Sequence, residues 1–336
     1  MKKTLALVLA AGLALSLSLV PVLADEAPEY TFKYAELNGD DNINTRVGYK
    51  FAEYVDELSE GRIKIDVFSA SQLGDEITCL NALQMGGGTV DFYRGNTNSL
   101  GDYGIKKMNL FGLPYIFTSR DSMWKVLEDE NLGQAFLSEG AEVGAGFIGI
   151  TYTDEGARHT FTSMEITGLN DLKGKKIRVP ETTLMMDTMS ALGAEPTPIS
   201  YSELYSSIQT GVVDGGENGY PGYDSNKFYE VAPYYLLDGH TFSPGVILMA
   251  EARWNELSEE DQAILKEAGQ KASAWNKEQI EKEEADLRAA LEEKGVTIID
   301  VPAEDLAAAQ EACQSVWANY SDGVEDELQA ILDIQK

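Results

Sequence analysis

Apolar and polar residues are patterned along the first third of the chain in a way that predicts alternating strands and helices. Residues 30–36 alternate with a period of two and are rich in aromatic side chains, which is typical of a strand. Apolar residues then recur at spacings of three and four and predict one helix: Ile43, Val47, Phe51, Val55 and Leu58. Gly61 ends this helix, and strands are predicted at 62–68 and 89–93, with a helix at 76–85 between them. This order predicts a largely parallel sheet with helices on its faces.

The middle of the chain repeats this alternation and predicts a second α/β unit. Residues 143–152 form a long apolar run, as expected of a strand that is buried on both faces. The same patterns predict strands at 158–162, 175–179, 212–217 and 242–250, and helices at 121–137, 183–192 and 202–210.

The last quarter of the chain has a different character, because Ala, Glu, Lys and Leu dominate it. Ser258 and Asp261 resemble a capping box, and only Gly269 interrupts the helical pattern that follows as far as Lys294. A helix of about 36 residues is roughly 54 Å long, which exceeds the width of one domain. We therefore expect helix 258–294 to lie across two domains. A strand at 296–301 and a final helix at 303–334 are predicted to follow it.

Residues 1–24 have the pattern of a secretory signal peptide. Two lysines precede an apolar run, and Val22-Leu23-Ala24 fits the small-x-small rule for cleavage. The alternative is an uncleaved membrane anchor, although Ser16, Ser18 and Pro21 interrupt the run. We expect cleavage after Ala24, export from the cytoplasm and a periplasmic location.

The length of the mature chain predicts two domains. Without the signal peptide about 312 of the 336 residues remain, which is more than one ordinary core organises. No low-complexity linker is present, so ordered strands must join the domains. We assign 25–153 plus 242–275 to the first domain and 154–241 plus 276–336 to the second, bridged by the long helix.

The charge of the chain limits its possible partners. Its formal net charge is −30 at pH 7, from 56 acidic and 26 basic residues. Such a protein repels nucleic acid and anionic membrane surfaces. An anionic ligand would need arginines placed locally against this field, and the sequence contains only eight arginines.

Several kinds of catalytic or cofactor site lack the residues that they need. The sequence has no GxGxxG, GxxxxGK[ST], GxSxG or HExxH motif. Only two histidines are present, His159 and His240, so we expect no metal, no cofactor and no catalytic triad. Asp214 and Glu217 are a possible carboxylate pair, but their spacing in a strand places them on opposite faces. Cys79 and Cys313 both lie in helical apolar patterns, which favours free thiols over a disulfide.

Three polar residues near predicted strand ends are candidates for ligand binding. Arg178 lies on the strand 175–179 and could hold a carboxylate with two parallel hydrogen bonds; a solvated cationic face is the alternative. Arg158 could do the same, or could form a surface pair with Asp154 or Glu155. Asn218 follows the strand 212–217, where open α/β sheets bind ligands, and otherwise reads as a turn residue.

Further candidates could complete a cleft between the domains. They are Glu36, Asn38, Arg94 and Asn96 near other strand ends, together with Glu76 and Tyr220. Tyr93, Tyr220 and Tyr223 could pack against a sugar or a carbon chain, although any one of them reads equally well as core.

Several stretches of the chain resemble one family, the solute-binding proteins of tripartite ATP-independent periplasmic (TRAP) transporters. They are SASQLGDEITCLNALQMGGGTVDF, DLKGKKIRVP, GAEPTPISYSELYSSIQTGVVDGGEN, YEVAPYYLLDGHTFSPG and RWNELSEEDQAILKEAG. The resemblance implies a periplasmic-binding-protein-like fold, in which two α/β domains close about hinge strands and a long C-terminal helix braces them. It also implies that Arg178 pairs with a ligand carboxylate, that Arg158 is a second ligand arginine and that Asn218 orients the ligand.

The same resemblance narrows the expected ligand. Asn96 falls where some sialic-acid-binding members place a Glu, and Asn38 lies one position from an Asn that they use. The segments around Arg158 and Asn218 are more similar to members that bind hexuronates such as glucuronate or galacturonate. We expect a monomer that hands this organic acid to the membrane subunits of a transporter. A four-carbon dicarboxylate as ligand, a sensor that docks to a signalling receptor and an enzyme acting on sugar acids are the alternatives.

Overall fold

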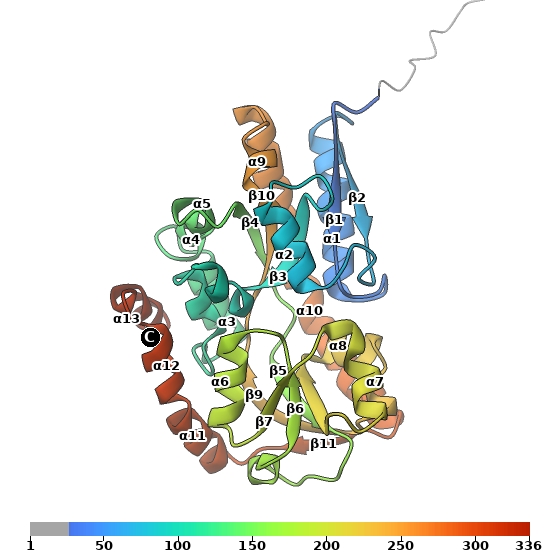
Figure 1. The fold of residues 1–336 in the computed structure, drawn as a ribbon, viewed down its shortest axis with the longest axis vertical. Coiled ribbons are helices and arrows are strands. Elements are labelled where there is room, and N and C mark those ends of the chain that lie inside the picture. Colours follow the sequence, from blue (N-terminus) through green and yellow to red (C-terminus); the bar gives the residue numbers. More distant parts are fainter. Residues whose placement is uncertain (1–26) are drawn as a thin grey trace, which may run out of the picture.

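Two β-sheets, one above the other in Figure 1, organise residues 27–336, which are the residues that the computed structural model describes. The predicted signal peptide, residues 1–24, lies outside them. Within 27–336, no helix combines the length and the apolar character needed to cross a membrane.

The first sheet has five strands and mixes parallel and antiparallel pairs. Its order is β2 (Ile63–Phe68), β1 (Tyr30–Ala35), β3 (Phe92–Asn96), β10 (Gly245–Ala250), β4 (Phe147–Thr153). β1 runs parallel to β2 and β3, whereas β10 is antiparallel to β3 and β4. Its helices are α1 (Ile43–Leu58), α2 (Glu76–Gln84), α3 (Arg120–Leu127), α4 (Gly133–Phe136), α5 (Glu139–Glu142) and α9 (Glu251–Trp254). The apolar stripe predicted for α1 is confirmed, because Val47, Phe51 and Val55 are buried against Phe32 and Tyr34 of β1.

The second sheet has six strands and contains its own two core clusters. Its order is β11 (Thr297–Asp300), β9 (Tyr234–Thr241), β5 (Arg158–Thr162), β8 (Gly215–Asn218), β6 (Lys176–Val179), β7 (Glu195–Pro198). β5 is antiparallel to both of its neighbours, and the remaining pairs are parallel. The helices α6 (Thr183–Ala191), α7 (Leu204–Gln209) and α8 (Tyr220–Ser225) belong to this half.

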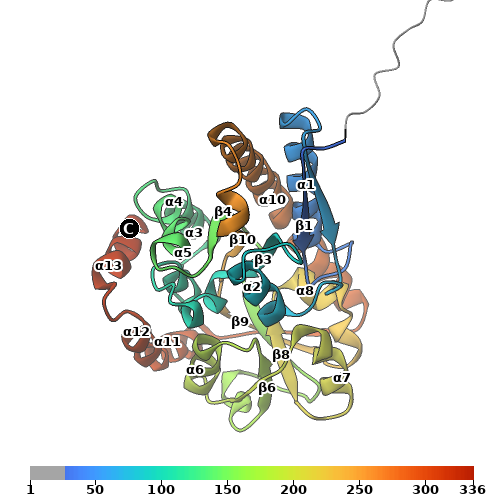
Figure 2. The ribbon, with the colours of Figure 1, turned by 45° about the horizontal axis from the view of Figure 1, so that its top comes forward.

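The helix predicted to span both domains is present as α10 (Glu259–Glu293), with the Ser258 side chain accepting a hydrogen bond from the backbone N–H of Asp261. Its first half packs on the core of the first sheet through Leu265, and Leu291 packs in the core of the second. Figure 2 shows its upper part beside α1, which it contacts. Gly269 allows this approach, because a Cβ there would lie 3.0 Å from Cγ2 of Ile150 in β4.

Four segments join the halves. Two of them are short: the chain crosses from β4 to β5 through residues 154–157 and returns from β9 to β10 through residues 242–244. It crosses again along α10, and the residues after β11 bring it back to the first half a last time. This arrangement confirms the predicted two-part α/β architecture with ordered crossing strands.

Two predicted helices are wrong in extent. Residues 121–137 contain α3 and α4 with a turn between them, because the carboxylate of Asp129 accepts hydrogen bonds from the backbone N–H groups of Asn131 and Leu132. Residues 303–334 form three helices, α11 (Ala303–Ala312), α12 (Gln314–Tyr320) and α13 (Glu325–Ile334). Gly323, with φ of +80°, turns the chain between the last two.

Some strands also differ from the prediction. β4 begins at Phe147 rather than at 143, because Gly144 and Gly146 have φ values of +72° and +81° and form a turn. β3 and β8 begin three residues later than predicted. The predictions missed β9, and they missed β7, an edge strand with two prolines in four residues.

The C-terminal helices return to the first sheet. Val316, Val324 and Ile331 are buried in the core cluster of the first half, and α13 contacts α3 (Figure 1). Residues 276–336 therefore pack on both halves, which differs from the prediction that all of them belong to the second domain. Cys79 and Cys313 are buried free thiols, as predicted.

Candidate functional site

A pocket between the two sheets collects most of the predicted site residues. Its empty volume is about 440 Å³, which includes space open to solvent. The predicted residues that line it are Asn38, Glu76, Arg94, Asn96, Arg158, Arg178 and Asn218. Because the first four come from the half of the first sheet and the last three from strands of the second, the pocket depends on both halves.

Arg178 is the arginine of this pocket without a carboxylate partner. β6 holds it at 3% exposure, its Nε donates a 2.7 Å hydrogen bond to the backbone oxygen of Ile199, and its guanidinium lies 5.5 Å from the ring centre of Tyr201. Within residues 27–336 no carboxylate oxygen lies within 4.0 Å of its guanidinium nitrogens. Burial lowers the pKa of Arg178, and the charge of Glu217 only partly offsets this. The guanidinium is nevertheless cationic, because arginine does not lose its proton in proteins.

The lack of a carboxylate partner distinguishes Arg178 from the other arginines. Each of the remaining seven has at least one carboxylate oxygen within 4.0 Å: Arg46, Arg62, Arg94, Arg120, Arg158, Arg253 and Arg288. Arg178 is therefore the one arginine that has no carboxylate oxygen of residues 27–336 within 4.0 Å, and it is also buried.

Arg158 forms a bidentate ion pair with Glu217. Its Nε and Nη2 lie 2.6 and 2.8 Å from the two carboxylate oxygens of Glu217, and its Nη1 donates to Glu155. Burial alone would lower the pKa of Arg158, but these two carboxylates raise it. The alternative of a pair with Glu155 is thus correct, although the pair is buried rather than on the surface.

Glu155 joins the two halves at the pocket and is a lining residue that was not predicted. One of its carboxylate oxygens accepts from Arg158 of β5, and the other lies 3.2 Å from Nη1 of Arg94 in β3. Glu36 pairs with Arg94 on the far side at 2.7 Å. The signal for Glu155 was its position directly after a buried strand, the same criterion that selected Arg158.

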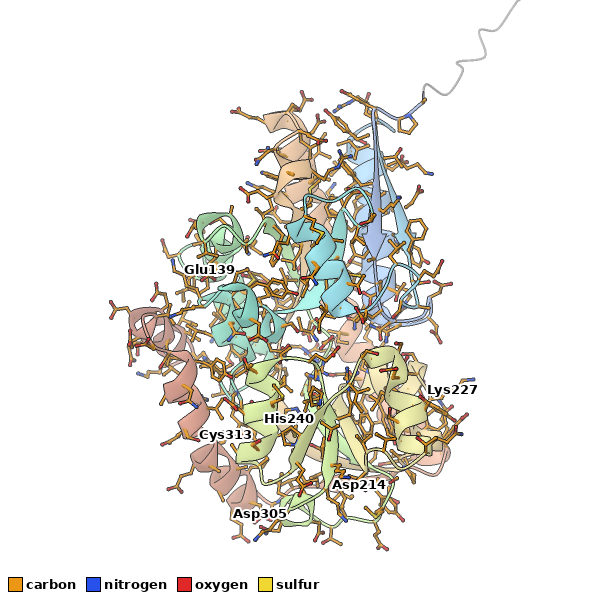
Figure 3. The ribbon with its side chains drawn as sticks, viewed as in Figure 1. Glu139, Asp214, Lys227, His240, Asp305 and Cys313 are labelled. Carbon is orange, nitrogen blue, oxygen red and sulfur yellow. The ribbon has the colours of Figure 1, made fainter. Side chains whose placement is uncertain are left out.

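A histidine lies behind the Arg158 pair. His240, labelled among the strands of the second sheet in Figure 3, lies 3.3 Å from Glu217 and 3.1 Å from Asp238. Burial would lower the pKa of His240, but Asp238 and Glu217 raise it to about 9. Burial would raise the pKa of Glu217, but Arg158 and His240 lower it to about 2. His240 and Glu217 are therefore both charged at neutral pH.

Neutral polar groups and one further acid complete the lining. Asn218 donates to the hydroxyl of Tyr201 at 3.0 Å, and its side-chain oxygen accepts from the backbone N–H of Gly219, which is the turn role considered for it. Glu76 accepts a 3.3 Å hydrogen bond from the hydroxyl of Tyr93, and burial raises its pKa although Ser99 and Arg178 oppose this. Asn44 and Tyr201 also line the pocket and were missed.

Two predicted site residues do not line the pocket. Glu36 is only 1% exposed, and its carboxylate accepts from Arg94 and from both nitrogens of Asn38, so it orients two lining residues from behind. Tyr220 begins α8 and its ring stacks on Tyr235 at 4.9 Å, because this helix faces the core of the second sheet. Tyr223 lies in the same core, and of the three tyrosines only Tyr93 reaches the pocket.

The pocket is suited to binding an anion and not to holding a metal. It offers one unpaired cation, several amide groups and a tyrosine hydroxyl within a framework of charge pairs. Among residues 27–336, no group of three or more His, Cys, Asp and Glu side chains is arranged to hold a metal ion. Asp214, labelled in Figure 3, precedes β8, whereas Asn218 ends that strand. Asp214 therefore does not line the pocket and forms no carboxylate pair there.

Comparison with known proteins identifies one family. The sequence profile of the family DctP, described as bacterial extracellular solute-binding protein, family 7, matches residues 35–322. A solute-binding protein of Chromohalobacter salexigens is 33% identical over 286 residues, covering 85% of this chain and 83% of the relative. A solute-binding protein of Roseobacter denitrificans is 34% identical over 299 residues, covering 89% of each.

Solved structures agree with this fold. A TRAP periplasmic solute-binding protein of Xanthobacter autotrophicus with bound β-D-galacturonate superposes with a TM-score of 0.84 at 28% identity, covering 90% of this chain and 99% of the other. A TRAP periplasmic solute-binding protein of Pseudomonas putida with bound D-glucuronate superposes with a TM-score of 0.84 at 27% identity, covering 90% of this chain and 96% of the other. A third, from R. denitrificans with bound L-galactonate, superposes with a TM-score of 0.82 at 32% identity, covering 90% of this chain and 99% of the other.

Proposed function

The chain belongs to the bacterial extracellular solute-binding proteins of family 7, the DctP family, and we propose that it captures a sugar acid such as glucuronate or galacturonate for a TRAP transporter. The observation that carries this proposal is Arg178, a buried cation in a polar pocket without a carboxylate partner among residues 27–336. A buried charge without a partner is unfavourable, so a bound carboxylate would be stabilising there. Its two oxygens match the guanidinium fork.

The rest of the lining favours a hydroxylated monoacid over a dicarboxylate. Arg94 and Arg158 already hold carboxylates of the protein, and Glu76 adds a further acid to the pocket wall. A second ligand carboxylate would have to displace Glu155 or lie close to Glu76, and like charges at close range repel. Sugar hydroxyls instead both donate and accept, as do the amides of Asn38, Asn44, Asn96 and Asn218. The uronates and the aldonate bound by the related structures support this choice.

The mechanism follows from a site that both halves build. An open cleft admits the acid, Arg178 takes its carboxylate, and closure of the halves excludes water and strengthens that pair. The ligand favours the closed state by its higher affinity for that state. The protein is exported after cleavage at Ala24, acts as a monomer in the periplasm, and releases its ligand to the membrane subunits. It binds without catalysing a reaction on the acid.

A thermal-shift panel with purified residues 25–336 tests the proposal. D-galacturonate, D-glucuronate, L-galactonate, succinate, sialic acid and D-galactose are compared at equal concentration. A ligand present at about a thousand times its dissociation constant adds about 4 kcal/mol of stability, which is a clear shift. We expect shifts with one or more of the sugar acids and none with galactose. A shift with galactose alone, or with succinate alone, would contradict the sugar-acid proposal.

A further inference from the structure

One buried side chain of α10 holds the backbone of a crossing segment. Asn276, near the middle of the helix, has no exposed surface. Its side-chain oxygen accepts a 2.6 Å hydrogen bond from the backbone N–H of Asp154, and its side-chain nitrogen donates 3.0 Å to the backbone oxygen of the same residue. A neighbouring strand would satisfy these two groups in a sheet. The amide of Asn276 therefore takes the place of a strand just after β4 ends at Thr153.

The side chain of Asp154 is fixed as firmly as its backbone. Its carboxylate accepts from Nε of Arg120 at 2.8 Å, from the indole nitrogen of Trp124 at 3.1 Å and from the backbone N–H of Gly156 at 2.8 Å. Asp154 is therefore anchored to α3 of the first half and to the bridging helix at once. The residue that follows it has little freedom to move.

That next residue is Glu155, which joins the pocket arginines. Arg94 comes from β3 in the first sheet and Arg158 from β5 in the second, and Glu155 contacts both. Asn44 also lies 3.4 Å from its carboxylate. Binding sites need their groups held to within about 0.5 Å by the residues behind them. A displaced Glu155 would therefore misplace both arginines beside Arg178.

We propose that Asn276 is a positioning residue for ligand binding: by fixing Asp154 it sets the place of Glu155, and so the geometry of the pocket, from a helix of which no residue lines that pocket. This inference rests on the proposed function, since its consequence is a change in ligand affinity. It assigns to the bridging helix a role in the site besides that of a brace.

The test compares Asn276→Ala with Leu265→Ala. Leu265 is a fully buried residue of the same helix that packs on the first core, so its truncation destabilises the protein without touching the crossing segment. We expect the dissociation constant for D-galacturonate or D-glucuronate, whichever wild type binds, to rise about tenfold in Asn276→Ala, which corresponds to about 1.4 kcal/mol. It should change less than about twofold in Leu265→Ala. A loss of affinity in Asn276→Ala that the destabilised Leu265→Ala variant does not share distinguishes a positioning role from a general structural role.

Amide hydrogen exchange of residues 154–156 without ligand is the second measurement. Exchange at Asp154 should accelerate in Asn276→Ala and not in Leu265→Ala, because only the first variant loses the acceptor of that N–H. Faster exchange with unchanged affinity would overturn the positioning role, and so would equal loss of affinity in both variants. If wild type binds neither acid, the functional proposal fails, while the exchange data still decide whether Asn276 fixes this segment. Asn276→Ser repeats the comparison if the alanine variant does not fold.

Discussion

At the scale of single residues, the three pocket arginines are chemically alike but differ in what they stabilise. Arg158 is part of the folded framework, since it forms a fork with Glu217 and pairs with Glu155. Arg178 donates its Nε to the backbone oxygen of Ile199, and its two terminal nitrogens have no carboxylate oxygen of residues 27–336 within 4.0 Å. The sequence makes both arginines candidates, because Arg178 lies on a predicted strand and Arg158 directly follows a buried one. It could not assign their different roles, since these depend on Glu155 and Glu217, which reach Arg158 and do not reach Arg178.

We therefore predict opposite outcomes for two matched truncations. Arg178→Ala should lower affinity for the sugar acid at least a hundredfold, about 2.7 kcal/mol, yet leave the free energy of unfolding of the ligand-free protein unchanged or slightly higher, because an unpaired buried cation is removed. Arg158→Ala should lower that free energy by about 3 kcal/mol or more, because the buried Glu217 loses its main partner. Urea unfolding and calorimetric titration measure the two quantities. Equal stability losses would contradict the distinction between an open and a filled fork.

The charged cluster behind the pocket predicts how stability depends on pH. The pKa of His240 is raised from 6.5 to about 9, so its contribution is complete below pH 6.5 and is lost as pH rises through 9. The pKa of Glu217 is lowered from 4.5 to about 2, so its contribution is complete above pH 4.5 and is lost as pH falls toward 2. The ligand-free protein should thus be most stable between about pH 4.5 and 6.5. His240→Gln should flatten the alkaline limb in urea unfolding at several pH values, and an unaltered limb would assign it to other groups.

At the scale of elements, the sequence predicted those whose periodicity is long and regular. α1 was predicted to within a few residues because its apolar stripe is explicit, and α10 because its Ser258 cap and its long run of helix-forming residues are. The breaks after Leu127 and Tyr320 were missed because helical spacing continues through them. A side-chain turn at Asp129 and the positive φ of Gly323 interrupt the backbone there without changing the apolar pattern. β7 was missed for the related reason that an edge strand with two prolines carries no strand-like pattern.

Gly269 tests how α10 meets the sheet. A Cβ on this residue would lie 3.0 Å from Cγ2 of Ile150 and 3.1 Å from Cβ of Thr151. We predict that Gly269→Leu lowers the free energy of unfolding by about 1–3 kcal/mol through overpacking, although leucine favours a helix by up to about 1 kcal/mol over glycine. Ala263→Leu, at an exposed position of the same helix, is the matched control and should have almost no effect. Stabilisation by Gly269→Leu would mean that the helix and β4 are not in close contact.

At the scale of the whole molecule, the net charge of −30 opposes the approach of the anionic ligand that we propose. The field of the whole protein acts on an approaching anion at long range, whereas the open fork of Arg178 acts only inside the pocket. Salt screens the long-range field of the protein, because the Debye length shrinks from about 30 Å at 0.01 M to about 8 Å at 0.15 M. Salt screens the contact with Arg178 much less, because that contact is buried. We therefore predict that association of the sugar acid becomes faster as ionic strength rises over this range, while dissociation changes little.

Stopped-flow fluorescence, with the tryptophans as the signal, measures the rates of association and dissociation. Mixing with galactose or with buffer alone controls for direct effects of salt. Slower association at higher salt would mean that Arg178 and its neighbours attract the anion from outside the pocket, and that the local field, not the net charge, governs capture.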